Sequence, residues 1–283
     1  MQKSLIGAAG FLLGLVSMGP SAQAATINND TLLFQGTLSQ VTTILVSPSG
    51  HVININDQEF NVNNTTYDGL AGFDTIFFTN FGDFLEAGAV QNVESFVAGN
   101  GNDVIDARFS NVQVTLLGGT GNDIGFGSAF FDILLGDSGD DILDGHLGAD
   151  FLDGGRGNDL LIGGGGADTY SISGFNELDT IIEAASDDIN VVQFAAGVNI
   201  DSITFENAGT DLLLTIAGAG QLLIKGQFDA PDSGIDTLKF RGGDPFDLRT
   251  LSGPQLAVAE PGTLAFLGLG VAGLALTRRR RPV

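Results

Sequence analysis

The pattern of apolar and polar positions repeats every nine residues in the middle of the chain. From residue 118, six successive units read GGTGNDIGF, GSAFFDILL, GDSGDDILD, GHLGADFLD, GGRGNDLLI and GGGGADTYS. Glycine usually fills places one and four, and the eighth place is usually large and apolar, as at Leu134, Leu143, Leu152, Leu161 and Tyr170. Glycine permits sharp turns with positive φ, so the pattern predicts short strands that point one side chain inward and are joined by tight turns.

The sixth place of every unit is aspartate: Asp123, Asp132, Asp141, Asp150, Asp159 and Asp168. If two units make one coil, residues 18 positions apart stack on the same edge, and the six aspartates form two columns. The repeat decays upstream, where residues 98–106 and 78–86 are further copies that contribute Asp103 and Asp83 after two-residue insertions. The sequence therefore predicts an all-β protein with a parallel β-roll, a β-helix solenoid, over residues 67–195.

Stacked carboxylates about 4.8 Å apart repel one another unless a cation lies between them. Ca²⁺ accepts six to eight oxygen ligands in a tolerant geometry, whereas Mg²⁺ demands a strict octahedron, so flexible turns with carboxylate and carbonyl oxygens favour calcium. The expected ligands are the carboxylates of Asp103, Asp123, Asp132, Asp141, Asp150, Asp159 and Asp168, with turn groups of Gly118, Thr120, Gly136, Ser138, Gly145, Leu147, Gly154 and Arg156.

Several departures from the repeat predict weaker or absent sites. Phe130 stands at place four and Gly125 at place eight, so we expect weaker sites beside Asp132 and Asp123. The segments 87–97 and 107–117 lack aspartate, so no calcium is expected on that edge there. Downstream, Asp179 and Asp188 lie nine apart without the glycines, which predicts final rungs with no strong metal site.

The six units resemble the G-G-x-G-x-D-x-U-x repeat of RTX (haemolysin-type) proteins, and this resemblance implies a β-roll that binds Ca²⁺. Residues 196–250 resemble the carboxy-terminal flank of such proteins, in DLLL from Asp211 and IDTLKF from Ile235. This region is predicted to be a β-rich C-terminal cap with strands near residues 202–206, 212–216, 221–225 and 237–240. Residues 25–66, with strands near 31–34, 40–47 and 51–55, are interpreted as an N-terminal β cap.

Both ends of the chain read as processing signals. Residues 1–24 combine Lys3, an apolar run and an Ala-Gln-Ala sequence, which is typical of a secretory signal peptide. RTX proteins are usually secreted without such a signal, so this chain differs from them in that respect.

After a linker at 251–258, residues 259–283 carry AEPGT, an apolar segment predicted to be a hydrophobic helix, and four terminal arginines. This tail resembles the PEP-CTERM sorting signal of Gram-negative bacteria, with Ala259 in place of the first proline. The resemblance implies processing by an exosortase and a destination at the cell surface or in the extracellular matrix. A permanent membrane anchor is the alternative, since arginines after an apolar segment hold that end in the cytoplasm.

The acidic composition and the absence of catalytic motifs limit the functions that the chain can have. The chain has 34 acidic and 11 basic side chains and no cysteine, which excludes nucleic-acid binding, disulfides and thiolate metal sites. It lacks G-x-S-x-G, H-E-x-x-H and P-loop motifs, and His51 and His146 are interpreted as surface residues. We therefore expect a non-enzymatic, secreted calcium-binding protein with a structural, adhesive or matrix role. The alternatives are a calcium-dependent secreted enzyme and a polysaccharide-binding scaffold, the latter favoured if Phe126, Phe130 and Phe131 form a surface cluster instead of core.

Overall fold

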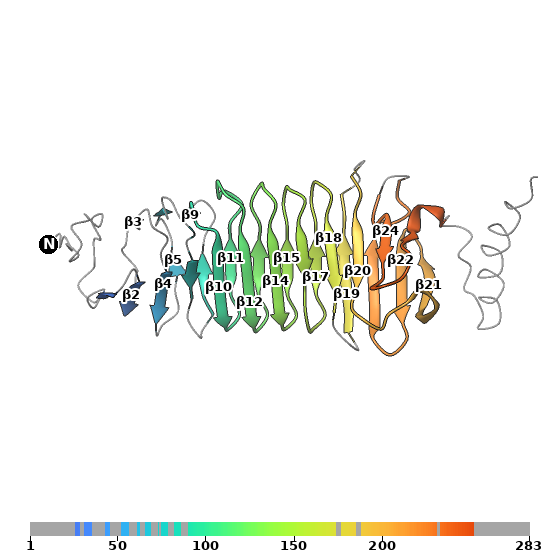
Figure 1. The fold of residues 1–283 in the computed structure, drawn as a ribbon, viewed down its shortest axis with the longest axis horizontal. Helices are drawn as coiled ribbons and strands as arrows, with labels where there is room; N and C mark the ends of the chain where they lie inside the picture. Colours follow the sequence, from blue (N-terminus) through green and yellow to red (C-terminus); the bar gives the residue numbers. More distant parts are fainter. Residues whose placement is uncertain are drawn as a thin grey trace, which may run out of the picture.

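The computed structural model describes the strands and a few flanking positions between residues 26 and 85, and then residues 90–173, 177–184, 188–230 and 233–251. This part of the chain is all-β, and its strands stack along one axis as a parallel solenoid of about five turns (Figure 1). The predicted fold class is confirmed there. The predicted signal peptide, the linker after Leu251 and the sorting tail lie outside the described residues. Within the described ranges, no helix is long and apolar enough to cross a membrane.

Each turn of the solenoid contributes one strand to each of two large sheets. The first sheet follows the order β1 (Thr26–Asn28), β2 (Thr31–Gln35), β4 (Val52–Asn56), β7 (Thr75–Phe77), β10 (Ser95–Asn100), β12 (Thr115–Thr120), β14 (Ile133–Ser138), β16 (Phe151–Asp153), β18 (Thr169–Ile172), β20 (Val191–Phe194), β24 (Thr237–Lys239) and β25 (Phe246–Asp247). The second follows the order β21 (Ile203–Ala208), β22 (Asp211–Ile216), β23 (Gly220–Lys225), β19 (Glu177–Ile182), β17 (Leu160–Ile162), β15 (Ile142–Asp144), β13 (Ile124–Phe126), β11 (Val104–Asp106), β8 (Phe84–Leu85) and β5 (Asn61–Val62). A small third sheet holds β3 (Thr43–Leu45), β6 (Thr66–Asp68) and β9 (Val90–Gln91).

The register of the parallel strands places the eighth position of each unit inside the solenoid. Leu134 pairs with Leu152 and Leu152 with Tyr170 in one sheet, while Leu143 pairs with Leu161 in the other. All five side chains are fully buried, which confirms the predicted inward direction. At Gly125 an added Cβ would approach Leu116 Cδ1 to 2.8 Å, so neighbouring leucines fill the space that this glycine leaves.

In every repeat unit except residues 127–135, the turn has positive φ at places two and four. Place four has φ between 123° and 140° at Gly121, Gly139, Gly148, Gly157 and Gly166, a region that only glycine adopts without strain. A Cβ on Gly139 would also collide with the carbonyl of Gly121 in the preceding turn. Place two lies nearer the left-handed region, with φ of 72° at Asp137 and 73° at His146, and therefore accepts other residues.

The two ends of the described solenoid differ from its middle. β2 and β4 pair in parallel with each other, and β4 pairs in parallel with β7, so these N-terminal strands lie in the same sheet as the repeats. At the other end β21, β22 and β23 form an antiparallel meander, and β23 adds to β19 in parallel. The strands predicted for the C-terminal cap are present, and Leu212, Leu214, Leu222 and Ile224 are fully buried.

Candidate metal centre

The place-six aspartates form two columns, one on each edge of the solenoid. Their side chains are 0–2% exposed. In the first column the Asp123 N–H donates to Asp141 Oδ1 at 2.7 Å, and the Asp141 N–H donates to Asp159 Oδ1 at 2.9 Å. In the second, the Asp132 N–H donates to Asp150 Oδ1 at 2.8 Å, and Asp168 continues the series. Upstream, the first column extends through Asp103 to Asp83. The stacking predicted from the 18-residue spacing is therefore present.

The second carboxylate oxygen has a different environment from the first. In six aspartates, Oδ2 is buried and finds no hydrogen-bond partner among the residues that the structure describes; we call it the open oxygen. The six are Asp103, Asp123, Asp141, Asp150, Asp159 and Asp168. A buried carboxylate oxygen without a partner is costly, and here the cost recurs at every turn. Such repetition indicates that a positively charged partner belongs at these positions.

Glycine at place one leaves room for that partner. A Cβ built on Gly118 would lie 2.5 Å from the open oxygen of Asp123 and 2.7 Å from the carbonyl oxygen of Gly136, one turn later. A Cβ on Gly145 would lie 2.5 Å from the open oxygen of Asp150 and 2.8 Å from the Gly163 carbonyl oxygen. One carboxylate and one carbonyl oxygen therefore converge above each of these glycines, and they are the donor types that Ca²⁺ prefers.

Burial makes the ionised form of these carboxyl groups unfavourable when no cation is present. Desolvation raises the pKa of Asp103 and Asp141 to about 7 and that of Asp150 to about 8, and neighbouring carboxylates in the columns add to the effect. The pKa values of Asp159 and Asp168 rise to about 6 for the same first reason. A divalent cation beside the open oxygens would remove this penalty, because it stabilises the charged form.

The turn groups predicted as ligands divide into two sets. The place-one carbonyl oxygens of Gly136 and Gly154 are oriented toward place one of the preceding turn in their column, and that of Gly145 toward Gly127. The place-three carbonyls of Thr120, Ser138 and Arg156 instead accept an N–H from the preceding turn at 2.8–2.9 Å, which leaves each oxygen one further lone pair. Leu147 donates its N–H to the Ser128 carbonyl at 3.4 Å, and its side chain is half exposed.

Asp132 differs from the other place-six aspartates because Ser128 donates to its carboxylate. The Ser128 N–H lies 2.5 Å from Oδ2, and the Ser128 hydroxyl lies 2.9 Å from Oδ1 and 3.0 Å from Oδ2. Asp132 therefore has no open oxygen. The sequence predicts a weaker site at Asp132 because Phe130 replaces a glycine. In the structure, the Ser128 donors satisfy the Asp132 carboxylate, and the sequence pattern does not predict this role for the serine at place two. Asp123 keeps its open oxygen although Gly125 stands at place eight.

Both columns continue beyond the last repeat. The Asp159 N–H donates to Asp179 Oδ1 at 3.1 Å, and the Asp168 N–H donates to Asn190 Oδ1 at 2.8 Å. The sequence-based alignment of Asp188 with the aspartate column is wrong, because Thr169 pairs with Val191 and so puts Asn190 at place six. Each of the last two half-turns is longer than nine residues: the delay of Asp179 relative to Asp168 is visible in the sequence, whereas the second insertion, before Asn190, is not.

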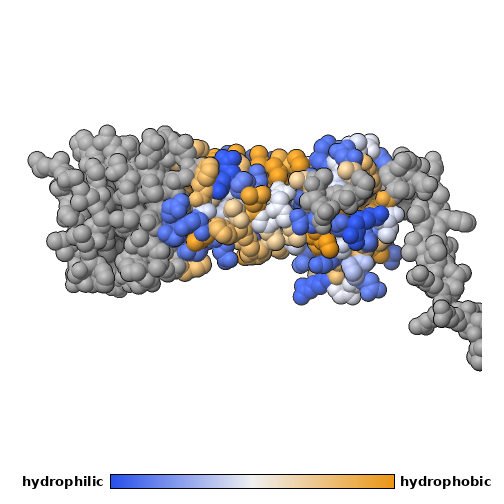
Figure 2. Space-filling model, turned by 90° about the horizontal axis from the view of Figure 1, so that it is seen from above, coloured by the Kyte–Doolittle hydropathy of each residue, from blue (hydrophilic) through white to orange (hydrophobic). Residues whose placement is uncertain are grey.

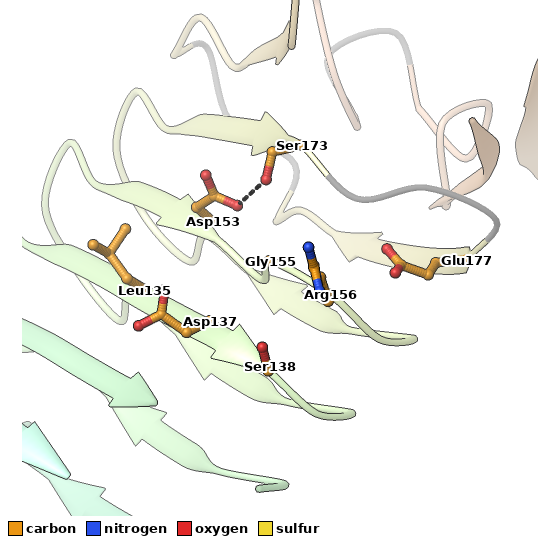
Figure 3. Close-up of a pocket in the computed structure, with 8 residues that line it drawn as sticks. All are labelled: Leu135, Asp137, Ser138, Asp153, Gly155, Arg156, Ser173 and Glu177. Atoms are coloured by element: carbon orange, nitrogen blue, oxygen red, sulfur yellow. Dashed lines mark hydrogen bonds between the residues drawn. The ribbon is translucent and has the colours of Figure 1, made fainter. Parts of the chain in front are cut away.

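The outer face of the first sheet carries two adjacent hollows. One, of about 670 Å³, is polar, and Asp137, Asp153, Arg156 and Glu177 line it with Leu135 (Figure 3). The other, of about 400 Å³, is lined by Leu135 again and by Phe131, Ile133 and Phe151. Phe130 and Phe131 are 48% exposed, so they belong to the surface. Phe126 is half-buried beneath the Arg108 guanidinium, 4.6 Å from the ring centre. Figure 2 shows hydrophobic residues gathered over the middle of the solenoid.

The repeats match a known family. Within the described ranges, no three His, Cys, Asp or Glu side chains gather into one metal-binding group, and the candidate sites at Asp123, Asp141 and Asp150 each combine a carboxylate with a backbone carbonyl. No curated protein sequence matches the chain. The family model for the RTX calcium-binding nonapeptide repeat (4 copies) matches residues 117–152 and 145–171, which include every place-six aspartate from Asp123 to Asp168. The solenoid thus contains nonapeptide repeats of the RTX calcium-binding type.

Proposed function

We propose that the chain is a secreted or cell-surface calcium-binding protein whose repeats fold around Ca²⁺, with a structural, adhesive or matrix role and no catalytic role. The observation that carries this proposal is the series of six open oxygens, each buried in a glycine turn. Three of them, at Asp123, Asp141 and Asp150, face a Cβ-sized space above a place-one glycine that also receives a carbonyl oxygen of the next turn. The match to calcium-binding repeats supports the same ion.

Metal-coupled folding follows from the charge of the turns. Bound Ca²⁺ supplies the positive charge that the buried carboxylates lack. The aspartates hold their Oδ1 atoms in the hydrogen-bond ladder and direct their open oxygens toward the turn carbonyls of the neighbouring coil. Without the ion, folding must bury ionised carboxylates or protonate them, and either costs free energy. Ligands that bind only the folded state stabilise it by mass action.

The location and partners rest on the two ends of the sequence. The signal-peptide-like residues 1–24 and the PEP-CTERM-like residues 259–283 support export, processing by an exosortase and exposure at a Gram-negative cell surface, with the tail in contact with the membrane before processing. Calcium is scarce in the cytoplasm and abundant outside the cell, so the chain would remain unfolded and exportable until it reaches the exterior. The net charge of -23 disfavours nucleic acid as a partner.

The test is far-UV circular dichroism of the full chain, first treated with a chelator and then titrated with Ca²⁺ or Mg²⁺. We expect a rise in β signal with Ca²⁺ at concentrations where Mg²⁺ has little effect. Asp141→Asn with Asp159→Asn keeps an Oδ1 acceptor for the ladder and removes two charges, so it isolates the role of the open oxygens. The matched control is Asp201→Asn with Asp244→Asn, because both of these side chains are exposed.

The double variant in the repeats should need more Ca²⁺ for the same β signal, and the exposed control should behave like the unmodified chain. Equal responses to Ca²⁺ and Mg²⁺, or identical midpoints for the two double variants, would contradict the proposal. A loss of β signal in the repeat variant that saturating Ca²⁺ never restores would likewise argue for a purely structural role of these carboxylates.

A polysaccharide-binding scaffold is the second candidate. The adjoining polar and apolar hollows support it, because sugars are bound through both hydrogen bonds and apolar contacts. We expect the Ca²⁺-loaded chain to bind neutral polysaccharides such as cellulose or dextran, and Phe131→Ala to weaken that binding. Phe109→Ala is the control, since Phe109 is exposed but does not line either hollow. Equal sedimentation of both variants with the polysaccharide, or none by the unmodified chain, would contradict this candidate.

A further inference from the structure

The second column of aspartates ends differently from its interior. Along this edge, place one of successive turns is Gly145, then Gly163, and then Glu183, because Ile162 pairs with Ile182 in the parallel register. Above Gly145 the open oxygen of Asp150 meets the carbonyl oxygen of Gly163. Above Gly163, the side chain of Glu183 from the next turn reaches into the corresponding space. A carboxylate thus stands where interior turns present a carbonyl group.

Three side-chain oxygens converge at this end of the column. Asp168 Oδ2, Tyr170 Oη and Glu183 Oε1 all lie within about 2.6 Å of the point that a Cβ on Gly163 would occupy. Asp168 and Tyr170 are 0% exposed, and Glu183 is half-buried. Oδ2 of Asp168 and Oε2 of Glu183 are buried and find no hydrogen-bond partner among the described residues. The open oxygen of Asp168 therefore shares one small space with Oε1 of Glu183, and the Glu183 carboxylate carries a second oxygen without a partner.

Tyr170 orients one of these carboxylates. Its hydroxyl donates a short hydrogen bond to Glu183 Oε1. The aromatic ring occupies place eight, inside the core, so the direction of the hydroxyl is set by packing. Tyr170 thus provides a partner for Oε1 of Glu183, whereas Oε2 of Glu183 and Oδ2 of Asp168 have no hydrogen-bond partner among the described residues.

We propose that Asp168 and Glu183 form a terminal calcium site, with Tyr170 as its positioning residue, that binds Ca²⁺ more tightly than the interior turns. The reason is charge: an interior turn places one carboxylate beside turn carbonyls, whereas this end places two carboxylates around one space. The affinity of calcium sites rises with the number of charged ligands. This inference rests on the proposed function and adds a site outside the nine-residue pattern.

The first experiment uses tyrosine as a reporter. The chain has two tyrosines and no tryptophan, so Tyr67→Phe leaves Tyr170 as the single tyrosine. Tb³⁺, a luminescent substitute for Ca²⁺, is titrated into this variant of the full chain with excitation of the tyrosine ring. The site beside Tyr170 is expected to fill first, so the sensitised emission should approach its plateau within the first bound equivalent, while further ions bind with little added emission. Emission that grows in proportion to every bound ion, or stays at background, would overturn the proposal.

The second experiment removes the charge of Glu183. Glu183→Gln keeps the length of the side chain and an acceptor for the Tyr170 hydroxyl. Glu206→Gln removes the same charge from an exposed position on β21 and is the matched control. Ca²⁺ bound per chain is measured by equilibrium dialysis, and circular dichroism in saturating Ca²⁺ checks the fold. We expect Glu183→Gln to lose one tightly bound ion, or to weaken the first binding step by about tenfold or more. The control should keep both the number of ions and their affinities.

The outcomes separate this site from the general proposal. If the unmodified chain binds several Ca²⁺ ions and Glu183→Gln binds the same number with the same affinities, the terminal site is wrong and the calcium-binding repeats stand. If the unmodified chain binds no Ca²⁺, both proposals fall. Should Glu183→Gln not fold, the Tb³⁺ titration of Tyr67→Phe still decides, because that variant leaves the site intact.

Discussion

The two edges of the solenoid share one hydrogen-bond ladder but differ in their open oxygens. On the first edge four aspartates in succession, Asp103, Asp123, Asp141 and Asp159, carry an open oxygen. The second edge begins at Asp132, whose carboxylate is satisfied by Ser128, and has open oxygens at Asp150 and Asp168. In both columns Oδ1 accepts the N–H of the residue one turn earlier.

This difference separates two roles of a place-six aspartate. The ladder needs an acceptor oxygen and no charge, as Asn190 shows by accepting the Asp168 N–H through an amide oxygen at 2.8 Å. The open oxygen needs a partner, which is Ser128 at one position and, in our proposal, an ion at the others. Asp→Asn substitutions can therefore remove one role while leaving the other in place.

The largest expected effect is that folding depends on pH when no metal is present, and aspartates of both edges contribute to it. Burial raises the pKa of Asp103, Asp141 and Asp150 from 3.8 to between about 7 and about 8, so the folded state holds more protons than the unfolded state over that interval. This stabilisation is complete below pH 3.8 and is lost as the pH rises through the folded-state values. In chelator, circular dichroism should show more β structure at about pH 4 than at about pH 8. A β signal that grows with pH would refute this.

The next largest effect is expected in the core that both edges share. Leu143 is fully buried, and Leu143→Ala should lower the free energy of unfolding by about 2–5 kcal/mol, because the cavity cannot collapse between stacked coils. Urea unfolding in saturating Ca²⁺ measures this change. Leu178→Ala is the control: its side chain is 40% exposed, and we expect a change within about 0.5 kcal/mol. Similar losses for the two variants would argue against a core packed through place eight.

The third effect, a difference in stability between two substitutions in the second column, is expected to be somewhat smaller. Asp150→Asn removes an open oxygen with its charge, whereas Asp132→Asn alters a carboxylate that Ser128 already satisfies. At a Ca²⁺ concentration 100 times the dissociation constant, one ion stabilises the fold by about 2.7 kcal/mol, so Asp150→Asn should lose about this amount of calcium-dependent stability. Asp132→Asn should lose little of it. Urea unfolding with and without Ca²⁺ gives both values, and equal losses would remove the distinction between the two aspartates.

The smallest expected effect belongs to Ser128 itself. Ser128→Ala removes the hydroxyl that donates to Asp132 and leaves the backbone N–H in place. Hydrogen bonds to charged groups contribute about 1.5–3 kcal/mol, and the remaining N–H donor should keep the loss near the lower figure. The measurement is urea unfolding at neutral pH with Ca²⁺ present. An unchanged stability would mean that the N–H alone satisfies Asp132.

The sequence predicts the periodic part of this molecule well, for a physical reason. In five of the six units place four has φ above 120°, which selects glycine, and place eight faces the core, where five of the six residues are Leu or Tyr. Both constraints therefore recur every nine residues in the sequence. The columns of aspartates follow from that period. The nine-residue pattern does not predict the roles of Ser128, Asn190 and Glu183. These roles depend on the position that each side chain reaches and on insertions in the last half-turns.

The N-terminal strands illustrate the same limit. The sequence there lacks the nonapeptide pattern and predicts only an N-terminal β cap, and the structure adds that β2 and β4 share the first sheet with the repeats. Backbone pairing of parallel strands does not need the nonapeptide motif, only matched strand lengths and directions. The exact domain boundaries therefore stay predictions, and so do the roles of both terminal segments.

The antiparallel strands at the sheet ends have a consequence for growth. In a stack of parallel coils, each rung is a template for the next, and a bare rung would accept a coil from another molecule. Both large sheets instead finish antiparallel: β1 on β2 and β25 on β24 in the first, and β21 on β22 at one end of the second. A second molecule that approached one of these three sheet ends would therefore meet an antiparallel strand at the edge, and not a rung of the parallel repeats.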